Sequence, residues 1–199
     1  MVSSGQYFET SPAAPSDERS VLVALPDLSL RLTTDRGVFS HGALDEGTKV
    51  LLTEAPLPPA GGALLDVGCG YGPIACALAA RSPGAVVWAV DVNERARALC
   101  AANATANGLA NVRVVAPEAV PADVAFDGIW SNPPIRIGKP ALHALLLTWL
   151  GRLAPDGRAH LVVHKHLGSD SLAVWLGAQG FAVERRASRH GYRVLDVHR

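Results

Sequence analysis

The sequence of 199 residues is poor in the residue types that define several large classes of protein. It holds only three cysteines, Cys69, Cys76 and Cys100, and no two of them form a CxxC pair. An odd, scattered set of this kind argues against a disulfide framework or a zinc site, and it predicts a reducing, cytoplasmic location. No apolar run approaches the roughly 18 residues that a membrane-spanning helix needs. We therefore expect no membrane partner and no metal.

The chain also lacks net charge, but its charges are unevenly distributed. Lys and Arg number 18, as do Asp and Glu. Residues 1–130 carry six more acidic than basic residues, and residues 131–199 carry six more basic than acidic ones. The basic carboxyl-terminal third agrees with an anionic partner such as RNA, although ordinary variation of a protein surface would also produce it.

About half of the residues are apolar, which suits one α/β domain with a sizeable core. The first 19 residues lack the basic segment followed by an apolar one that marks a signal peptide, and they predict a flexible polar tail. Residues 20–199 are expected to form a single domain, and we expect it to be a monomer. Within it, 20–60 should form a hairpin and helix cap, with a strand or hairpin at 28–42, and 61–199 the core.

A helix is predicted over 45–55, and after residue 62 short apolar strands alternate with helices. We predict strands over 63–67, 85–92, 111–116, 126–131 and 158–165, and helices over 72–82, 94–108, 140–153 and 169–180. The chain closes with two strands joined at His190 and Gly191. This order predicts a parallel sheet covered on both faces, and the closing pair must be an antiparallel hairpin.

A glycine-rich segment, LLDVGCGYGP, runs from the first core strand into a helix. Gly68, Gly70 and Gly72 alternate there, a spacing that differs from the GxGxxG of dinucleotide sites. Glycines permit positive φ and let a ligand lie against the backbone. Asp91 ends the next strand, where a carboxylate can accept hydrogen bonds from ribose hydroxyls. The glycine-rich segment and Asp91 together predict a nucleoside-containing cofactor. The alternative is a purely structural tight turn with an acid that caps a helix.

The segment WSNPPIRIGK follows the fourth core strand. Pro133 and Pro134 end the strand and make a rigid corner at the carboxyl edge of the sheet. The carbonyl of Asn132 and the backbone carbonyl of Pro133 could accept the two hydrogens of an amine conjugated with a ring. That would localise the amine lone pair for methyl transfer, by positioning rather than by a strong base. A structural turn between strand and helix is the alternative.

Together, LLDVGCGYGP, AVDVN and SNPPI resemble class I methyltransferases that modify exocyclic nitrogens. GVFSHGALDEGTKVLL, NPPIRIGKPALH and the closing GYRVL are similar to the small-domain methyltransferases related to the bacterial small-subunit rRNA guanine-N2 methyltransferase. The resemblance implies a Rossmann-like, seven-stranded, mostly parallel sheet with an antiparallel last strand. It implies S-adenosylmethionine as cofactor, S-adenosylhomocysteine as product and a guanine N2 amine of rRNA as target. The partner would be rRNA or a ribosomal subunit.

The resemblance also assigns roles to individual residues. For the cofactor it implies Asp66, Gly68, Cys69, Gly70, Gly72, Asp91, Val92, Glu118, Ala119 and Asn132. For catalysis it implies Asn132, Pro133, Pro134 and Ile135, and for substrate binding it implies Phe39, His41 and Asp45. Ile135 stands where many such enzymes have an aromatic ring, so stacking must come from elsewhere, with Phe39 as the candidate. Arg136 and Lys139 flank this corner and are candidates for substrate phosphate.

Other residues have ordinary explanations. His160, His164 and His166 share a strand face without accompanying acids, so a pH-sensitive or RNA-facing strand end is favoured over metal binding. The arginines of the closing hairpin could contact phosphate or deter strand pairing. Trp149 and Trp175 are predicted to lie in the core. Two rival functions stay open: a methyltransferase for a protein glutamine or small-molecule amine, and a non-catalytic cofactor-binding module.

Overall fold

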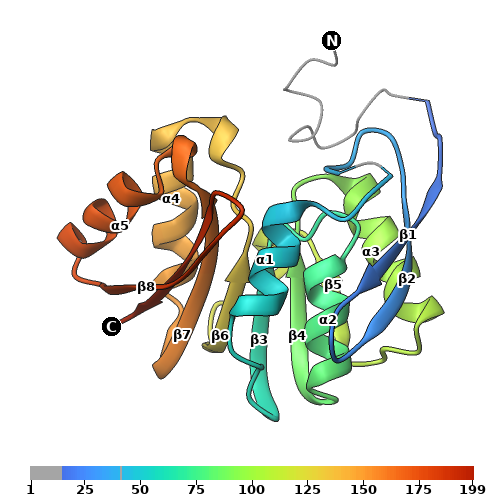
Figure 1. Ribbon diagram of the computed structural model, residues 1–199. Coiled ribbons are helices and arrows are strands. Elements are labelled where there is room, and N and C mark those ends of the chain that lie inside the picture. Colours follow the sequence, from blue (N-terminus) through green and yellow to red (C-terminus); the bar gives the residue numbers. More distant parts are fainter. Residues whose placement is uncertain (1–14, 41) are drawn as a thin grey trace.

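The computed structural model describes residues 15–40 and 42–199 (Figure 1). Its main feature is a seven-stranded sheet of order β5-β4-β3-β6-β7-β9-β8. The strands are β3 (Gly61–Val67), β4 (Gly84–Val90), β5 (Val112–Val115), β6 (Phe126–Ser131), β7 (Leu153–His164), β8 (Ala182–Arg189) and β9 (Tyr192–His198). The last strand, β9, pairs antiparallel with both β7 and β8, and all other pairs in the sheet are parallel. The predicted mostly parallel sheet with an antiparallel last strand is confirmed.

Helices cover both faces of the sheet (Figure 1). The helices are α1 (Glu46–Glu54), α2 (Pro73–Arg81), α3 (Glu94–Ala106), α4 (Lys139–Leu150) and α5 (Ser169–Ala178). Neighbouring strand residues point to opposite faces, so Leu64 joins one apolar cluster with α1, α2 and α3, and Leu65 joins another with α4 and α5. Because both faces are covered, the ends of the strands remain as the place for a site.

A separate two-stranded hairpin, β1 (Arg19–Ala24) and β2 (Ser29–Thr34), packs beside α3. Asn103 on α3 holds it, since its side chain accepts from Thr33 N–H at 2.7 Å and donates to Thr33 C=O at 2.8 Å. Only β2 lies within 28–42, because the chain leaves the strand conformation at the buried Asp35 and turns at Gly37 with φ 82°. The hairpin therefore begins earlier in the sequence than the alternation predicted.

The β8–β9 hairpin closes through His190 and Gly191, the two residues that the sequence placed there. Both have positive φ, 48° and 81°, as a two-residue type I′ turn requires. No helix of the described residues is long and apolar enough to cross a membrane.

Candidate active site

The glycine turn after β3 is held against the end of β4. Gly68 and Cys69 donate their N–H groups to the Val90 carbonyl at 2.9 and 3.0 Å. Gly68 has φ 76°, and a Cβ added there would meet nothing within 4 Å. The exposed backbone of this turn is therefore a cradle open to a ligand, with space that a side chain would fill.

Asp91, directly after β4, fixes the turn from the other side. Its Oδ2 accepts from Gly70 N–H and its Oδ1 from Asn93 N–H, both at 2.9 Å. Burial raises the pKa of Asp91, and these backbone hydrogen bonds only partly offset it. Each carboxylate oxygen can accept further hydrogen bonds, so Asp91 retains capacity for ribose hydroxyls.

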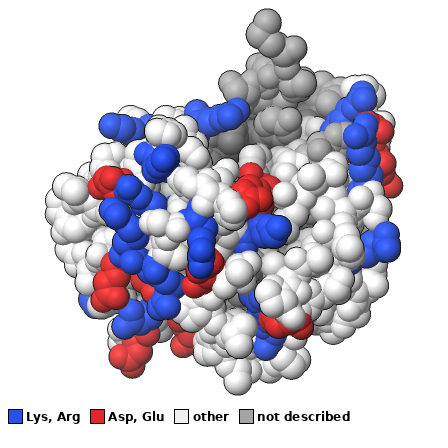
Figure 2. All heavy atoms as spheres, viewed as in Figure 1, with Lys and Arg blue, Asp and Glu red and all other residues white. Residues whose placement is uncertain are grey.

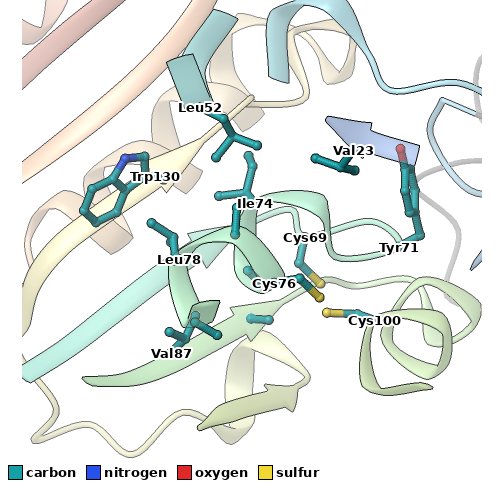
Figure 3. Packing of buried hydrophobic residues seen from close by; sticks show 14 of the residues in the cluster. Val23, Leu52, Cys69, Tyr71, Ile74, Cys76, Leu78, Val87, Cys100 and Trp130 are labelled. Carbon is teal, nitrogen blue, oxygen red and sulfur yellow. The ribbon is translucent and has the colours of Figure 1, made fainter. Parts of the chain in front are cut away.

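Three predicted cofactor residues lie beneath the turn rather than at its surface. Asp66 is fully buried, and its Oδ2 accepts from Ala75 N–H at 2.9 Å, which ties β3 to the first turn of α2. Cys69 is buried beside Cys100, as Figure 3 shows. A Cβ on Gly72, whose φ is 93°, would lie 2.7 Å from the Cys100 sulfur. These residues shape and support the turn.

The second half of the site is the corner after β6. Ser131 is buried and its Oγ donates to the Val67 carbonyl at 2.7 Å, so the ends of β6 and β3 are joined. The Ile135 N–H donates to the Pro133 carbonyl at 2.8 Å around Pro134, whose φ of −74° and ψ of 72° define an inverse γ-turn. The Pro133 carbonyl thus already has one partner and one remaining acceptor position.

The amide of Asn132 is oriented by the start of α1. Its Nδ2 donates to Asp45 Oδ2 at 2.8 Å and to Thr48 Oγ1 at 3.1 Å. Since a carboxylate only accepts, the NH₂ group must face Asp45 and the carbonyl oxygen must face away. Among the described residues nothing donates to this Oδ1. A free acceptor of fixed direction therefore stands at the corner.

The turn, Asp91 and the corner border one cavity of about 500 Å³. This volume lies within the range of about 300–1,000 Å³ for small-molecule sites. Of the predicted residues, the cavity wall contains Phe39, Asp45, Gly68, Gly70, Asp91, Val92, Asn132, Pro133, Pro134, Ile135 and Arg136. The structure thus brings the predicted cofactor turn and the predicted catalytic corner to one space.

Other predicted residues lie outside this wall. Glu118 and Ala119 belong to the short 3₁₀ helix Pro117–Ala119, of which Pro117 borders the cavity. Lys139 is exposed at the start of α4, beyond the corner. His41 lies outside the described residues.

The cavity wall also includes residues that the sequence interpretation did not select. Tyr192 and His164 border it from β9 and the end of β7, and Trp149 borders it from α4. Trp149 is also buried, as predicted, whereas Trp175 is half-buried and stacks on His143 with ring centroids 3.6 Å apart. Tyr192 follows the turn glycine in the closing GYRVL segment, the signal that could have indicated it.

The histidines and arginines near the carboxyl terminus are used mainly within the fold. His160 is buried and its Nδ1 lies 2.7 Å from Asp196 Oδ1, so it does not share an exposed face with His164 and His166. No group of three or more metal-ligating side chains occurs in the part of the chain that the structure describes. Each arginine of the closing hairpin has an acidic partner: Arg185 and Arg193 with Asp170, Arg186 with Asp196, and Arg189 with Glu54.

Comparison with known proteins relates this geometry to a family. The family model described as methyltransferase small domain matches residues 29–196. The uncharacterized protein YbxB of Bacillus subtilis is 34% identical over 197 residues, which is 98% of each chain. The ribosomal RNA small subunit methyltransferase C of Shewanella halifaxensis is 36% identical over 166 residues, 80% of this chain and 47% of that protein.

A solved structure has the same fold. The 16S rRNA N2 G1207 methyltransferase of T. thermophilus, in complex with AdoMet and guanosine, superposes with a TM-score of 0.78 and 25% identity. The match covers 94% of this chain and 52% of that one. The chain therefore spans about half the length of the rRNA methyltransferases that it matches.

Proposed function

The chain belongs to the methyltransferase small domain family, an S-adenosylmethionine-dependent methyltransferase fold, and we propose that it methylates the exocyclic N2 amine of a guanine in small-subunit ribosomal RNA. The observation that carries this proposal is the oriented carbonyl of Asn132, to which no described residue donates, across one cavity from the glycine turn. The related T. thermophilus enzyme acts at a guanine N2, which supports this choice of amine. An rRNA substrate also implies a cytoplasmic enzyme.

The residues on the cofactor side fit the group that the family uses. The open backbone at Gly68 leaves room for the amino-acid part, and Asp91 has acceptor capacity for the ribose hydroxyls. Val92 and Pro117 would enclose the adenine, because both border the cavity next to Asp91. When bound there, S-adenosylmethionine supplies an electrophilic methyl group.

The residues on the substrate side do the positioning. The amine of guanine is a poor nucleophile because its lone pair is delocalised into the ring. Asn132 Oδ1 would accept one amine hydrogen and the free acceptor position of the Pro133 carbonyl the other, which aims the lone pair into the cavity. Rigid, pre-placed acceptors lower the barrier without reorganising during the reaction. The guanine must leave its stack to reach this position.

The test is methyl transfer from radiolabelled S-adenosylmethionine to separated ribosomal subunits and naked rRNA, with the labelled nucleotide mapped. Wild-type protein should label one guanine at N2. Asn132→Ala should lower the rate about 100- to 1,000-fold with cofactor affinity nearly unchanged. The matched control is Asn107→Ala, which removes an asparagine at the end of α3 outside the cavity and should retain activity. Label found in protein, or equal loss of cofactor binding in Asn132→Ala, would contradict the proposal.

A further inference from the structure

A second, smaller cavity adjoins the candidate active site. It measures about 190 Å³ and lies at the β8–β9 turn. Its wall consists of Lys165, Ser188, Arg189, His190, Gly191, Tyr192 and Arg193. Tyr192 belongs to the walls of both cavities, so the two spaces lie next to each other at this residue.

The hairpin turn and the end of β7 hold this small cavity in a fixed shape. The Lys165 N–H donates to the Gly191 carbonyl at 2.8 Å, which joins the short 3₁₀ helix Lys165–Leu167 to the turn. A Cβ on Gly191 would lie 2.7 Å from His164 Nε2, so glycine is needed for this close approach. The hairpin turn and the Lys165–Leu167 helix, which carry the basic side chains of the cavity, are therefore held in a fixed relative position.

The chemistry of the wall is one-sided. It contains Lys165, Arg189, Arg193 and His190 and no acidic side chain, but Asp170 pairs with Arg193 and Glu46 lies 3.9 Å from His190 Nε2, both from outside the wall. Arg189 pairs with Glu54 at 3.2 Å, but the arginine side chain is 65% exposed, and such surface pairs contribute little. Within residues 15–40 and 42–199, Lys165 is exposed and has no acidic partner. Lys165 therefore carries a solvent-exposed positive charge at the cavity that no acidic side chain of the described residues neutralises.

Two further basic residues without an acidic partner among the described residues lie at the same end of the sheet, the carboxyl ends of its parallel strands. Arg136 borders the large cavity and Lys139 begins α4, and neither pairs with an acidic group of the described chain. The segments after β6 and β7 and the β8–β9 turn all lie at the carboxyl ends of their strands, so they are neighbours in space. Figure 2 shows Lys and Arg concentrated on the side of this face where Figure 1 places β7, β8 and α5, with acidic residues among them.

From these observations we infer that the small cavity is a phosphate subsite for the RNA strand that delivers the target nucleotide. The inference rests on the proposed function. The target base would occupy the large cavity, and a flanking backbone phosphate would lie beyond Tyr192 against Lys165, Arg189 and His190. Arg136 would contact the strand on the other side of the base. Phosphate contacts of this kind fix the register of a strand without reading its sequence.

The experiment compares Lys165→Ala with a matched variant, Arg158→Ala. Arg158 is exposed in the middle of β7, outside both cavity walls, and also lacks an acidic partner among the described residues. The probe is an oligoribonucleotide that spans the nucleotide labelled by wild-type protein. We expect Lys165→Ala to raise KM for this RNA several-fold, leaving kcat and S-adenosylmethionine affinity unchanged. The slope of log affinity against log salt should become shallower by about 0.7. Lys165→Arg should restore both, because it retains the charge.

Two results would overturn the inference in different ways. If Lys165→Ala and Arg158→Ala have the same KM and salt slope while wild-type protein methylates RNA, the subsite is wrong and the proposed function stands. If wild-type protein transfers label to no RNA, or labels a protein, both fail together. Thermal unfolding of each variant separates these outcomes from a folding defect, and Lys165 is exposed, so none is expected.

Discussion

Asp45 and Asn132 lie 87 residues apart in the sequence and share a hydrogen bond of 2.8 Å between their side chains. The same Asp45 oxygen accepts from Thr48 N–H at 2.8 Å as the N-cap of α1. One carboxylate therefore begins a helix and sets the direction of the candidate catalytic amide. In the proposed mechanism, the amino-terminal segment would thus position the catalytic amide as well as cover the core.

The first prediction concerns this pair. Asp45→Ala should lower kcat about tenfold or more, because the amide of Asn132 is no longer held in one orientation. It should also cost about 1 kcal/mol of unfolding free energy through loss of the cap. Asp45→Asn still offers an oxygen to Thr48 N–H and Asn132 Nδ2, so it should retain most activity. Steady-state kinetics and urea unfolding of both variants test this; equal kcat values for them would exclude a positioning role.

The sequence predicted the frame of the molecule because its signals are local. Apolar strands, helix caps such as Asn93 and the turn residues His190 and Gly191 each act on adjacent backbone, and the order of these elements was predicted correctly. One boundary was wrong, because the strand predicted over 158–165 already begins at Leu153. The fold and the S-adenosylmethionine-dependent family were confirmed by the sheet order and the family match. Within 28–42 the structure has one strand, β2, rather than a whole hairpin, since strand alternation does not show where tertiary contacts to Asn103 select the register.

What the sequence could not show is which side chains share a space. The hydrogen bond between Asp45 and Asn132 joins segments that are far apart in the chain. Tyr192 likewise reaches the wall of the large cavity from a distant segment. Conversely, a motif does not distinguish residues that face a ligand from those that support the turn beneath it. Gly68 and Gly72 belong to one motif, yet one faces open space and the other packs against Cys100.

The second prediction separates these two glycines. Gly72→Ala places a Cβ 2.7 Å from the Cys100 sulfur at a φ of 93°, so it should lower the unfolding free energy by about 2 kcal/mol. Gly68→Ala meets no clash, so only its positive φ should lower the unfolding free energy, by about 1 kcal/mol. Its methyl group fills the open space at the turn, however, and should weaken cofactor binding about tenfold or more. Urea unfolding and titration calorimetry measure the two effects. Cys100→Ala should partly restore Gly72→Ala, and no coupling between them would contradict the clash.

The third prediction concerns the pH dependence of stability. Burial raises the pKa of Asp66 to about 8, and the hydrogen bond from Ala75 N–H offsets this only in part. In the unfolded chain the pKa is about 3.9, so between about pH 4 and 8 the folded state binds more protons. The free energy of unfolding should therefore fall as pH rises through this window.

Asp66→Asn provides the check, because it retains an acceptor for Ala75 N–H and cannot ionise. Its unfolding free energy should depend less on pH than that of the wild type over this window. Urea unfolding of both proteins at several pH values measures the two slopes. Parallel slopes would show that Asp66 titrates near its ordinary value.

The fourth prediction concerns the buried pair under β7 and β9. Burial raises the pKa of Asp196, but the hydrogen bonds and charges of His160 and Arg186 outweigh it and lower the pKa overall. Its contribution to stability is thus present above the unfolded pKa of about 3.9 and is lost as pH falls through the lower folded value. His160→Ala should lower the unfolding free energy by about 3 kcal/mol at neutral pH, since a buried carboxylate loses a partner.

The matched control for this pair is His198→Ala, at the edge of the same hairpin. His198 Nδ1 lies 3.0 Å from the Arg199 carbonyl and its Nε2 lies 3.9 Å from the exposed Glu184 carboxylate; such surface contacts contribute little, so its loss should change stability by about 0.5 kcal/mol or less. Calorimetric unfolding distinguishes the two variants. Equal effects would mean that the His160–Asp196 pair contributes nothing specific.

The fifth prediction concerns how the target base is held. Phe39 is 50% exposed and borders the large cavity, whereas Ile135, at the corner, offers no ring. Stacking of a base on an aromatic side chain contributes about 1–3 kcal/mol. Phe39→Ala should therefore raise KM for RNA about tenfold, with cofactor affinity unchanged. Phe39→Leu retains apolar bulk without a ring, and Phe39→Tyr retains the ring. If Phe39→Leu matches wild type and Phe39→Tyr does not, apolar contact rather than stacking holds the base, and the aromatic role assigned to Phe39 is wrong.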